Sequence, residues 1–195
     1  ILPGHYTPEI EIFRGYWLIS WFKKEFAQKE VMEALESDIQ PEELLNRRLK
    51  EIPAGCDGLL LQPYFTPNLT MPEAKGSVIG LSDVHTRIHL YRAIIEGINF
   101  ALMDGMRHME KKGGFRFEEI RVGGGGAQSS EICQITADMF GLPVVRTQTY
   151  EVSGIGSAIS AFVTLGVFED YREALRCMVH KKDVFKPNRR QHAVY

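Results

Sequence analysis

The stretch RVGGGGAQSSEICQITADMF, residues 121–140, decides the fold. An apolar run over 117–122 ends in four consecutive glycines, and Ile132, Ile135 and Met139 then recur at helical spacing. That order predicts a strand, a glycine turn and a helix. Each glycine in an ordered element costs about 0.5–1 kcal/mol relative to alanine. Four in a row therefore indicate either a slack linker or a backbone that something approaches closely.

The predicted turn has the features of an anion site. A helix N-terminus presents unpaired backbone N–H groups and a partial positive charge, and glycines let the backbone approach a phosphate. The spacing matches neither common phosphate loop. A dinucleotide fingerprint from Gly124 and Gly126 would need a third glycine where Ser129 stands, and no Gly-Lys-Ser/Thr follows for a P-loop. A plain strand-to-helix turn without a ligand is the alternative.

Two further strand-to-helix junctions carry glycines or small residues. The segment YEVSGIGSAISA, residues 150–161, opens a helix that contains Gly154 and Gly156, and Gly80 lies near the end of a predicted strand over 76–82. Three such junctions can surround one ligand at the carboxyl ends of the strands. For Gly80 the alternative is a strand-end turn. For Gly154 and Gly156 it is close packing between helices.

Periodicity and turn residues predict the remaining elements. Helices are expected over residues 16–36, 41–50, 85–112, 129–141, 153–166 and 170–179, and strands over 57–64, 76–82, 117–122 and 143–147. The first helix should bury one broad stripe of Trp17, Trp21, Phe22 and Phe26. Asp83 is the expected cap of the longest helix, and Gly113 and Gly114 should end it. Helices first, then strands alternating with helices, favour an α/β fold with a mostly parallel central sheet.

Composition and charge exclude several classes of function. With 195 residues and 44% hydrophobic content, the chain suits one globular domain, or one and a small appendage. The formal net charge of −2 argues against a nucleic-acid partner. No apolar run could span a bilayer and no signal peptide is expected, so a cytoplasmic location is the default. Cys56, Cys133 and Cys177 show neither disulfide nor zinc spacing, and His85 and His89 lack a third ligand, so no metal site is predicted.

The chain resembles the C-terminal domain of the FGGY carbohydrate kinases, a group of sugar and polyol kinases. The matching residues are Gly124-Gly125-Gly126-Ala127, Gln134, Ala137-Asp138, Gly141-Leu142-Pro143-Val144 and, upstream, Arg92-Ala93 and Glu96-Gly97 of an RA-x-x-EG helix. The resemblance covers about residues 11–195. The whole chain, 1–195, is therefore expected to be the nucleotide-binding C-terminal domain, with the N-terminal sugar-binding domain absent from this chain.

The resemblance implies an actin-like, ribonuclease-H-like α/β fold with a central mixed sheet flanked by helices. It also implies an ATP-dependent kinase that uses Mg²⁺ and takes its catalytic aspartate from the N-terminal domain. No catalytic residue is named in this chain, Asp57 and Asp83 being candidates by residue type only, and the chain alone should be inactive. The residues implied at the nucleotide are Gly80, Gly125, Gly126, Ala127 and Ser130. Asp138 is expected to hold a neighbouring loop.

Xylulose is the best-supported substrate by analogy with the family. Cys133 stands where the family has a bulky residue. The loop after Pro63 lacks the stretches typical of xylulose and glycerol kinases, so glycerol, ribulose, gluconate and erythritol remain alternatives. Homodimers are common in the family. Two alternatives are not kinases: an actin-like module that ATP and ADP switch, and an interaction domain with a decayed site. A catalytic aspartate in the rest of the protein would favour the kinase.

Overall fold

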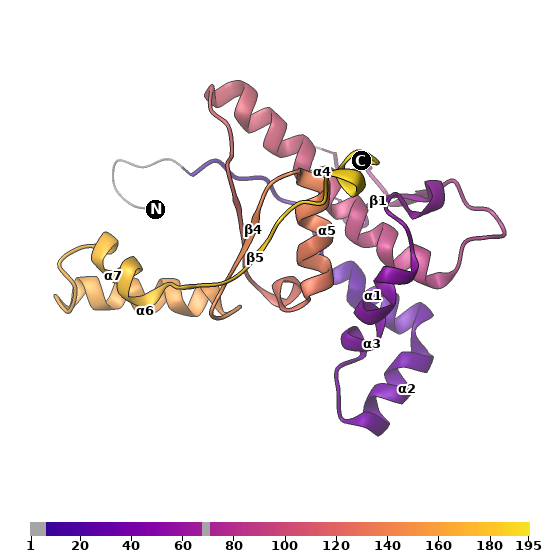
Figure 1. Ribbon diagram of the computed structural model, residues 1–195, viewed down its shortest axis with the longest axis horizontal. Helices are drawn as coiled ribbons and strands as arrows, with labels where there is room; N and C mark the ends of the chain where they lie inside the picture. The colour runs from indigo at the N-terminus through magenta and orange to yellow at the C-terminus, as the bar shows by residue number, and fades with distance from the viewer. Residues whose placement is uncertain (1–6, 68–70) are drawn as a thin grey trace. The chain divides into compact units, whose positions relative to one another are not determined.

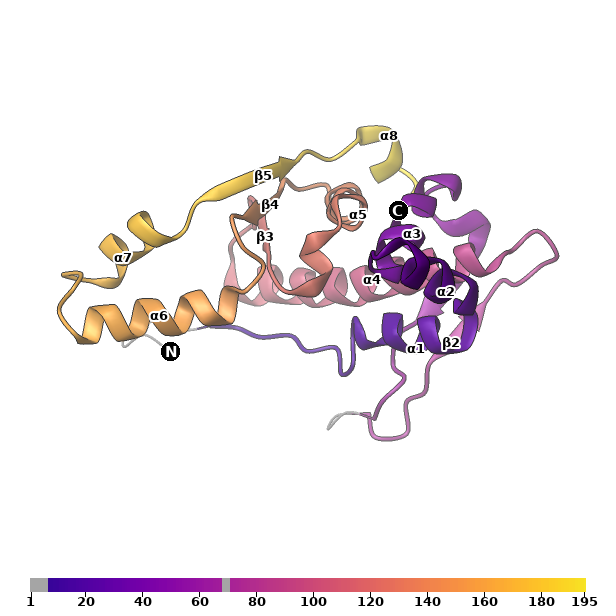
Figure 2. The same ribbon diagram turned by 90° about the horizontal axis from the view of Figure 1, so that it is seen from below.

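The computed structural model describes residues 7–67 and 71–195. It divides into two compact units, the first comprising Ile1–Phe117 with Arg190–Tyr195 and the second Glu118–Arg189. Figure 1 labels the long helix α4 (Arg87–Gly113) of the first unit, and Figure 2 shows the same elements from below. In the part of the chain that is described, no helix combines the length and the apolar character needed to cross a membrane.

The first unit is mainly helical. Its elements are α1 (Trp17–Phe26), α2 (Gln28–Ser37), α3 (Pro41–Arg48), η1 (Leu49–Glu51), η2 (Cys56–Gly58), β1 (Leu60–Gln62), β2 (Ser77–Ile79) and α4 (Arg87–Gly113), with α8 (Arg189–His192) at its boundary. The strands β1 and β2 pair antiparallel. Helix α4 crosses β1 so closely that a Cβ on Gly97 would meet the carbonyl oxygen of Leu61. Close packing of α4 on β1 therefore explains the glycine of the RA-x-x-EG motif.

The predicted first helix is two helices. The break falls at Ala27, whose φ of −123° and ψ of 31° are not helical. Ala27 is buried, and so is Phe22, but Trp17 is 70% exposed and Phe26 43% exposed. The prediction of one aromatic stripe was therefore wrong for these two residues. The break lets each short helix pack separately, and Leu18, in place of Trp17, shares the buried face with Phe22.

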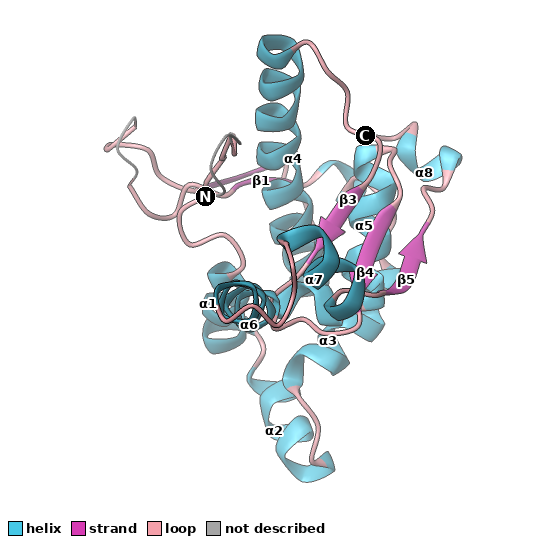
Figure 3. Ribbon diagram, turned by 90° about the vertical axis from the view of Figure 1, so that its left-hand side faces the viewer, coloured by secondary structure: helices cyan, strands magenta, loops and turns pink. Residues whose placement is uncertain are grey.

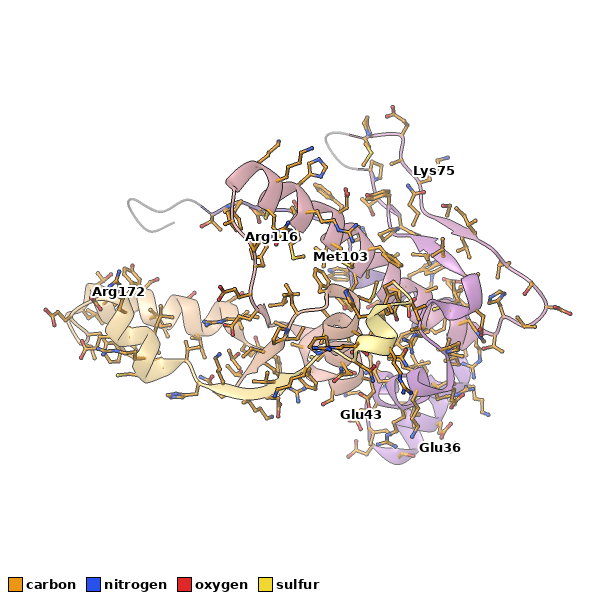
Figure 4. All side chains as sticks on the ribbon, turned by 45° about the horizontal axis from the view of Figure 1, so that its top comes forward. Glu36, Glu43, Lys75, Met103, Arg116 and Arg172 are labelled. Atoms are coloured by element: carbon orange, nitrogen blue, oxygen red, sulfur yellow. The ribbon has the colours of Figure 1, made fainter. Side chains whose placement is uncertain are left out.

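Helix α4 begins later than its expected start and has a different cap. Thr86 takes the place predicted for Asp83: its Oγ1 accepts from the N–H of Ile88 at 3.3 Å, and its own N–H donates to Nδ1 of His89 at 3.0 Å. This is a capping box in which histidine replaces the usual glutamate. The expected end is confirmed, with Gly114 left-handed at φ 67°. Figure 4 labels Met103 on this helix and Arg116 just beyond it.

The second unit contains the sheet predicted around the glycines. Its elements are β3 (Ile120–Val122), η3 (Gly125–Gln128), α5 (Ser130–Phe140), β4 (Val144–Thr147), α6 (Val152–Thr164), α7 (Tyr171–Met178) and β5 (Lys181–Phe185). The strand order is β3-β4-β5, with β3 parallel and β5 antiparallel to β4, as the arrows in Figure 3 show. Helix α5 packs Cys133 and Ala137 against Val144 of the sheet.

The sheet is mixed, as the family resemblance implied. The expectation of a mostly parallel sheet was wrong, because among the described strands only β3 and β4 run parallel, while β4–β5 and β1–β2 are antiparallel. Strand β5, with the sequence KKDVF, was not predicted. Three of its five residues are charged and it pairs with β4 alone, so its structure depends on that neighbour more than on its own side chains.

A buried carboxylate joins three helices of the first unit. Glu30 of α2 is 3% exposed and accepts two hydrogen bonds from the guanidinium of Arg87 at 2.5 and 2.6 Å, while Arg48 lies 3.6 Å away. Burial acts to raise the pKa of Glu30, but the hydrogen bonds from Arg87 and the charges of both arginines outweigh it. The pKa therefore lies below its ordinary value.

Replacing Glu30 with glutamine should destabilise the protein in a pH-dependent way. We expect the free energy of unfolding at neutral pH to fall by about 2 kcal/mol, because two arginines lose their counter-charge. A carboxyl whose pKa is lowered by folding adds stability above its unfolded pKa and loses it as the pH falls through the folded pKa. The gap between wild type and variant should therefore close below about pH 4 in chemical unfolding measurements. An equal gap at neutral and acidic pH would contradict this role.

Candidate functional site

The glycine turn connects β3 to α5 as expected, with one additional feature. After β3 ends, Gly124 adopts a left-handed φ of 78°, and its N–H donates to the carbonyl of Tyr150 at 2.8 Å. A single 3₁₀ turn then spans Gly125–Gln128 before the helix begins. This connection is an ordered turn with defined hydrogen bonds, which removes the slack-linker interpretation.

The N-terminus of α5 is capped by its own side chains. Ser129 Oγ accepts from the N–H of Ile132 at 3.2 Å and donates to Oε2 of Glu131 at 2.9 Å. Glu131 stabilises the positive end of the helix and also places a negative charge in its first turn. Ser130, beside it, is exposed. An anion at this helix end would meet one unfavourable charge, so other groups must compensate for it.

Arg146 on β4 supplies a positive charge directly beneath the turn. Its Nη1 donates to the carbonyl oxygens of Ala127 at 3.0 Å and Gln128 at 2.9 Å, and its Nη2 donates to Ser130 Oγ at 3.2 Å. Asp183 on β5 holds the guanidinium from the other side, at 2.8 Å from Nε and 2.6 Å from Nη2. The sequence reasoning did not identify Arg146. Its signal was a single charge inside the otherwise apolar strand PVVRT.

Cys133 lies beneath the same turn. Its Sγ donates to the carbonyl of Ala127 at 3.6 Å, and burial raises the pKa of its thiol to about 11. The thiol is therefore a neutral, inert packing group at neutral pH.

The five residues expected at the nucleotide divide between the two units. Gly125, Gly126, Ala127 and Ser130 follow one another along the turn and the start of α5 in the second unit. Ala127 is buried, its N–H donates to the carbonyl of Gly124 and its carbonyl accepts from Arg146, so a ligand could meet this residue only through van der Waals contact. Gly80 belongs to the first unit, where its φ is +91° and a Cβ would lie 2.5 Å from the carbonyl oxygen of Gly58. This close approach explains why a glycine stands at position 80 without any ligand.

Gly125 differs from Gly80 in what a side chain would meet. Apart from Gly125 and its two chain neighbours, no described residue has an atom within 4 Å of a Cβ built on Gly125, and its φ is outside the left-handed region. The fold therefore gives no reason for a glycine at this position, whereas a ligand close to the backbone would. The same holds for Gly154 and Gly156 on α6: among the residues that the structure describes, nothing comes within 4 Å of a Cβ at either. Close packing between helices does not account for them within this unit.

Asp138 has the structural role expected of it. It is 8% exposed, and its Oδ1 accepts from Gln134 Nε2 and from the backbone N–H of Asn188, both at 2.8 Å. The carboxylate thus attaches the segment after β5 to helix α5. This also explains Gln134 of the family pattern, which in addition donates to the carbonyl of Lys186 at 2.9 Å.

Asp57 lies in a strained turn and does not begin a strand as predicted. Residues 55–58 all have positive φ, including 51° at Cys56 and 53° at Asp57. His89 Nδ1 accepts the Thr86 N–H, so its proton is on Nε2, which donates to Asp57 Oδ2 at 3.1 Å. His85 Nδ1 likewise accepts from the N–H of Ser82 at 2.9 Å. Both histidines thus use Nδ1 in local caps, and no group of three metal-binding side chains occurs in the described chain.

Comparison with known proteins gives a consistent set of relatives. The model of the FGGY family of carbohydrate kinases, C-terminal domain, matches residues 1–165. The chain is 31% identical over 176 residues to a protein of Escherichia coli K12 described as "Uncharacterized sugar kinase YgcE", covering 90% of this chain and 36% of that protein. It is 31% identical over 194 residues to a xylulose kinase of Staphylococcus epidermidis RP62A, covering 98% of this chain and 37% of that kinase.

A solved structure has the same fold. The ligand-bound xylulose kinase of Lactobacillus acidophilus superposes with a TM-score of 0.73 at 25% identity, over 92% of this chain and 35% of that one. The chain thus spans little more than a third of the length of the relatives it matches.

Proposed function

Because this chain belongs to the FGGY family of carbohydrate kinases, we propose that the protein which carries it transfers the γ-phosphoryl group of ATP to a hydroxyl of a sugar or polyol. The observation that carries the proposal is the ordered glycine turn, in which Gly125 leaves open the space that a side chain would occupy. We propose residues 1–195 as the nucleotide-holding domain, and Gly80, Gly125, Gly126, Ala127 and Ser130 as its nucleotide contacts. A cytoplasmic location follows from the need for ATP.

The residues of the turn suit nucleotide phosphates. Backbone N–H groups of Gly125 and Gly126 can donate to phosphate oxygens that approach without a Cβ in the way. The start of α5 adds its partial positive charge, and the hydroxyl of Ser130 adds a donor. When bound, ATP would supply the phosphoryl group, and Mg²⁺ would neutralise part of the negative charge of the phosphates. The chain itself binds and orients the nucleotide.

The remaining groups of the reaction belong outside this chain in our proposal. Phosphoryl transfer depends on positioning and charge stabilisation, with a carboxylate to accept the proton of the attacking hydroxyl. Asp57 is held by His89 in a structural turn, and Asp138 is buried under the segment after β5, so neither is offered as that base. We place the base and most sugar contacts in an N-terminal domain. The 195 residues alone should bind nucleotide without turnover.

The proposal is tested with the complete protein in a coupled assay for ADP production. The panel contains xylulose, ribulose, glycerol, gluconate and erythritol. We expect rapid turnover with one of them, and xylulose first, since a xylulose kinase is among the relatives that match over nearly the whole chain. Flat traces for every sugar together with clear ADP binding would favour the switch-like module. No turnover and no ADP binding would contradict the proposal altogether.

A further inference from the structure

We propose that Arg146 is a positioning residue for the nucleotide, holding the glycine turn and the hydroxyl of Ser130 in the orientation that binds phosphate. The inference rests on the proposed function and names a residue for which neither the sequence pattern nor the family match gives a role. It starts from the five hydrogen bonds of this one guanidinium: two to carbonyls of the turn, one to Ser130 at the start of α5 and two to Asp183.

Arg146 holds two carbonyl groups of the turn, so that both point toward its guanidinium. In a trans peptide the C=O and the following N–H point in opposite directions. Arg146 binds the carbonyls of Ala127 and Gln128, so the N–H groups of Gln128 and Ser129 point away from the guanidinium. The arginine therefore fixes the direction of these two peptide groups, which directly follow Gly125 and Gly126 along the chain. A planar guanidinium with several donors in fixed directions is suited to this, because it can bind both carbonyls at once.

The hydroxyl of Ser130 is oriented by the same group. Its oxygen accepts from Nη2 of Arg146 at 3.2 Å, so its own proton is left to be donated elsewhere. Ser130 is exposed, which leaves that donor accessible to a phosphate or ribose oxygen.

The arginine is itself rigidly held. Its side chain is 14% exposed, Asp183 accepts from both Nε and Nη2, and the ring of Phe185 lies 5.3 Å from its central carbon. Because the guanidinium is held by these contacts, it keeps the groups that it binds in the turn in one orientation. The partners Asp183 and Phe185 both come from β5, which gives this edge strand a function.

The test measures the KM for ATP and the KM for the sugar separately in the complete enzyme. Arg146→Gln should raise the KM for ATP about tenfold, as expected for the loss of charge-assisted hydrogen bonds, and leave the KM for the sugar within about twofold. Arg146→Lys keeps the charge and the attraction to Asp183, but one ammonium cannot bind both carbonyls and Ser130. Its KM for ATP should still rise several-fold while its melting temperature stays near that of wild type. Arg121→Gln, on the exposed ion pair with Glu119 of the same unit, is the matched control and should change neither constant.

Two further results decide between positioning and general stability. In a double-mutant cycle, Arg146→Gln and Ser130→Ala should be less than additive in the KM for ATP, because the arginine acts partly through that hydroxyl. If the lysine variant folds and both KM values match wild type, the inference is overturned, whether or not the glutamine variant folds. Equal increases in both KM values would also overturn it. A wild-type enzyme that neither binds ADP nor turns over any sugar would instead show that the proposed function is wrong, and the inference would fail with it.

Discussion

Replacing Gly125 with valine is expected to weaken ADP binding about 100-fold and to leave the protein folded. Beyond its two chain neighbours, no described residue comes within 4 Å of a Cβ at this position, and its φ is one that other residues adopt. A new side chain would therefore project into the space that we assign to the phosphates. The clash costs about 1–3 kcal/mol, and a lost hydrogen bond to a charged group costs about 1.5–3 kcal/mol. A combined loss of about 3 kcal/mol corresponds to about 100-fold in the dissociation constant.

The measurement pairs calorimetric titration with ADP and a thermal melt of the same variant. Gly125→Ala provides a graded comparison and should give a smaller loss of affinity. Gly97→Ala provides the opposite behaviour, because its Cβ would meet the carbonyl oxygen of Leu61 and the crossing of α4 over β1 must loosen. Gly125→Val should reduce ADP affinity without changing the melting temperature, whereas Gly97→Ala should lower the melting temperature. Unchanged ADP affinity in a folded Gly125→Val protein would remove the glycine turn from the nucleotide site.

The parts of the fold that were predicted correctly have strong local signals. The order strand, glycine turn and helix within residues 121–140 follows from glycines beside two apolar patterns. Helix α4 follows from a long three- and four-residue periodicity and from Gly114 at its end. The parts that were missed depend on distant residues. The break at Ala27 contains neither glycine nor proline, so no residue in the sequence marks it. It depends on the separate packing of the two helices.

The candidate site shows the same division. The glycines could be recognised because they are conspicuous in the sequence. Arg146 could not, since its partners lie 16 to 37 positions away and two of the four are backbone carbonyls, which carry no sequence signature. Conversely, Gly80 matches a family glycine and yet has a local reason in its contact with Gly58. A motif match alone does not separate a glycine that the fold requires from one that a ligand requires.

The pair Arg92 and Glu96 of the RA-x-x-EG motif forms a buried polar network in the first unit. Glu96 is 2% exposed, and its Oε1 accepts from Arg92 Nε and from the hydroxyl of Tyr195, both at 2.6 Å. Arg92 also donates to the carbonyls of Leu49 at 3.0 Å and Ile52 at 2.7 Å. Burial and the negative charge of Glu96 raise the pKa of the Tyr195 hydroxyl, which therefore stays protonated and able to donate. The motif is thus explained by folding, with one carboxylate neutralising a buried arginine.

We therefore expect Glu96→Gln to lower the free energy of unfolding by about 3–5 kcal/mol, because it leaves a buried guanidinium without its counter-charge. The control is Glu43→Gln on α3, whose partner Arg47 lies at the same four-residue spacing, 3.3 Å away, with the two side chains 53% and 61% exposed. That exposed pair should be worth less than about 0.5 kcal/mol. Chemical unfolding of both variants measures the difference. Equal losses would mean that burial does not set the strength of these pairs, and that the motif is kept for a reason other than folding.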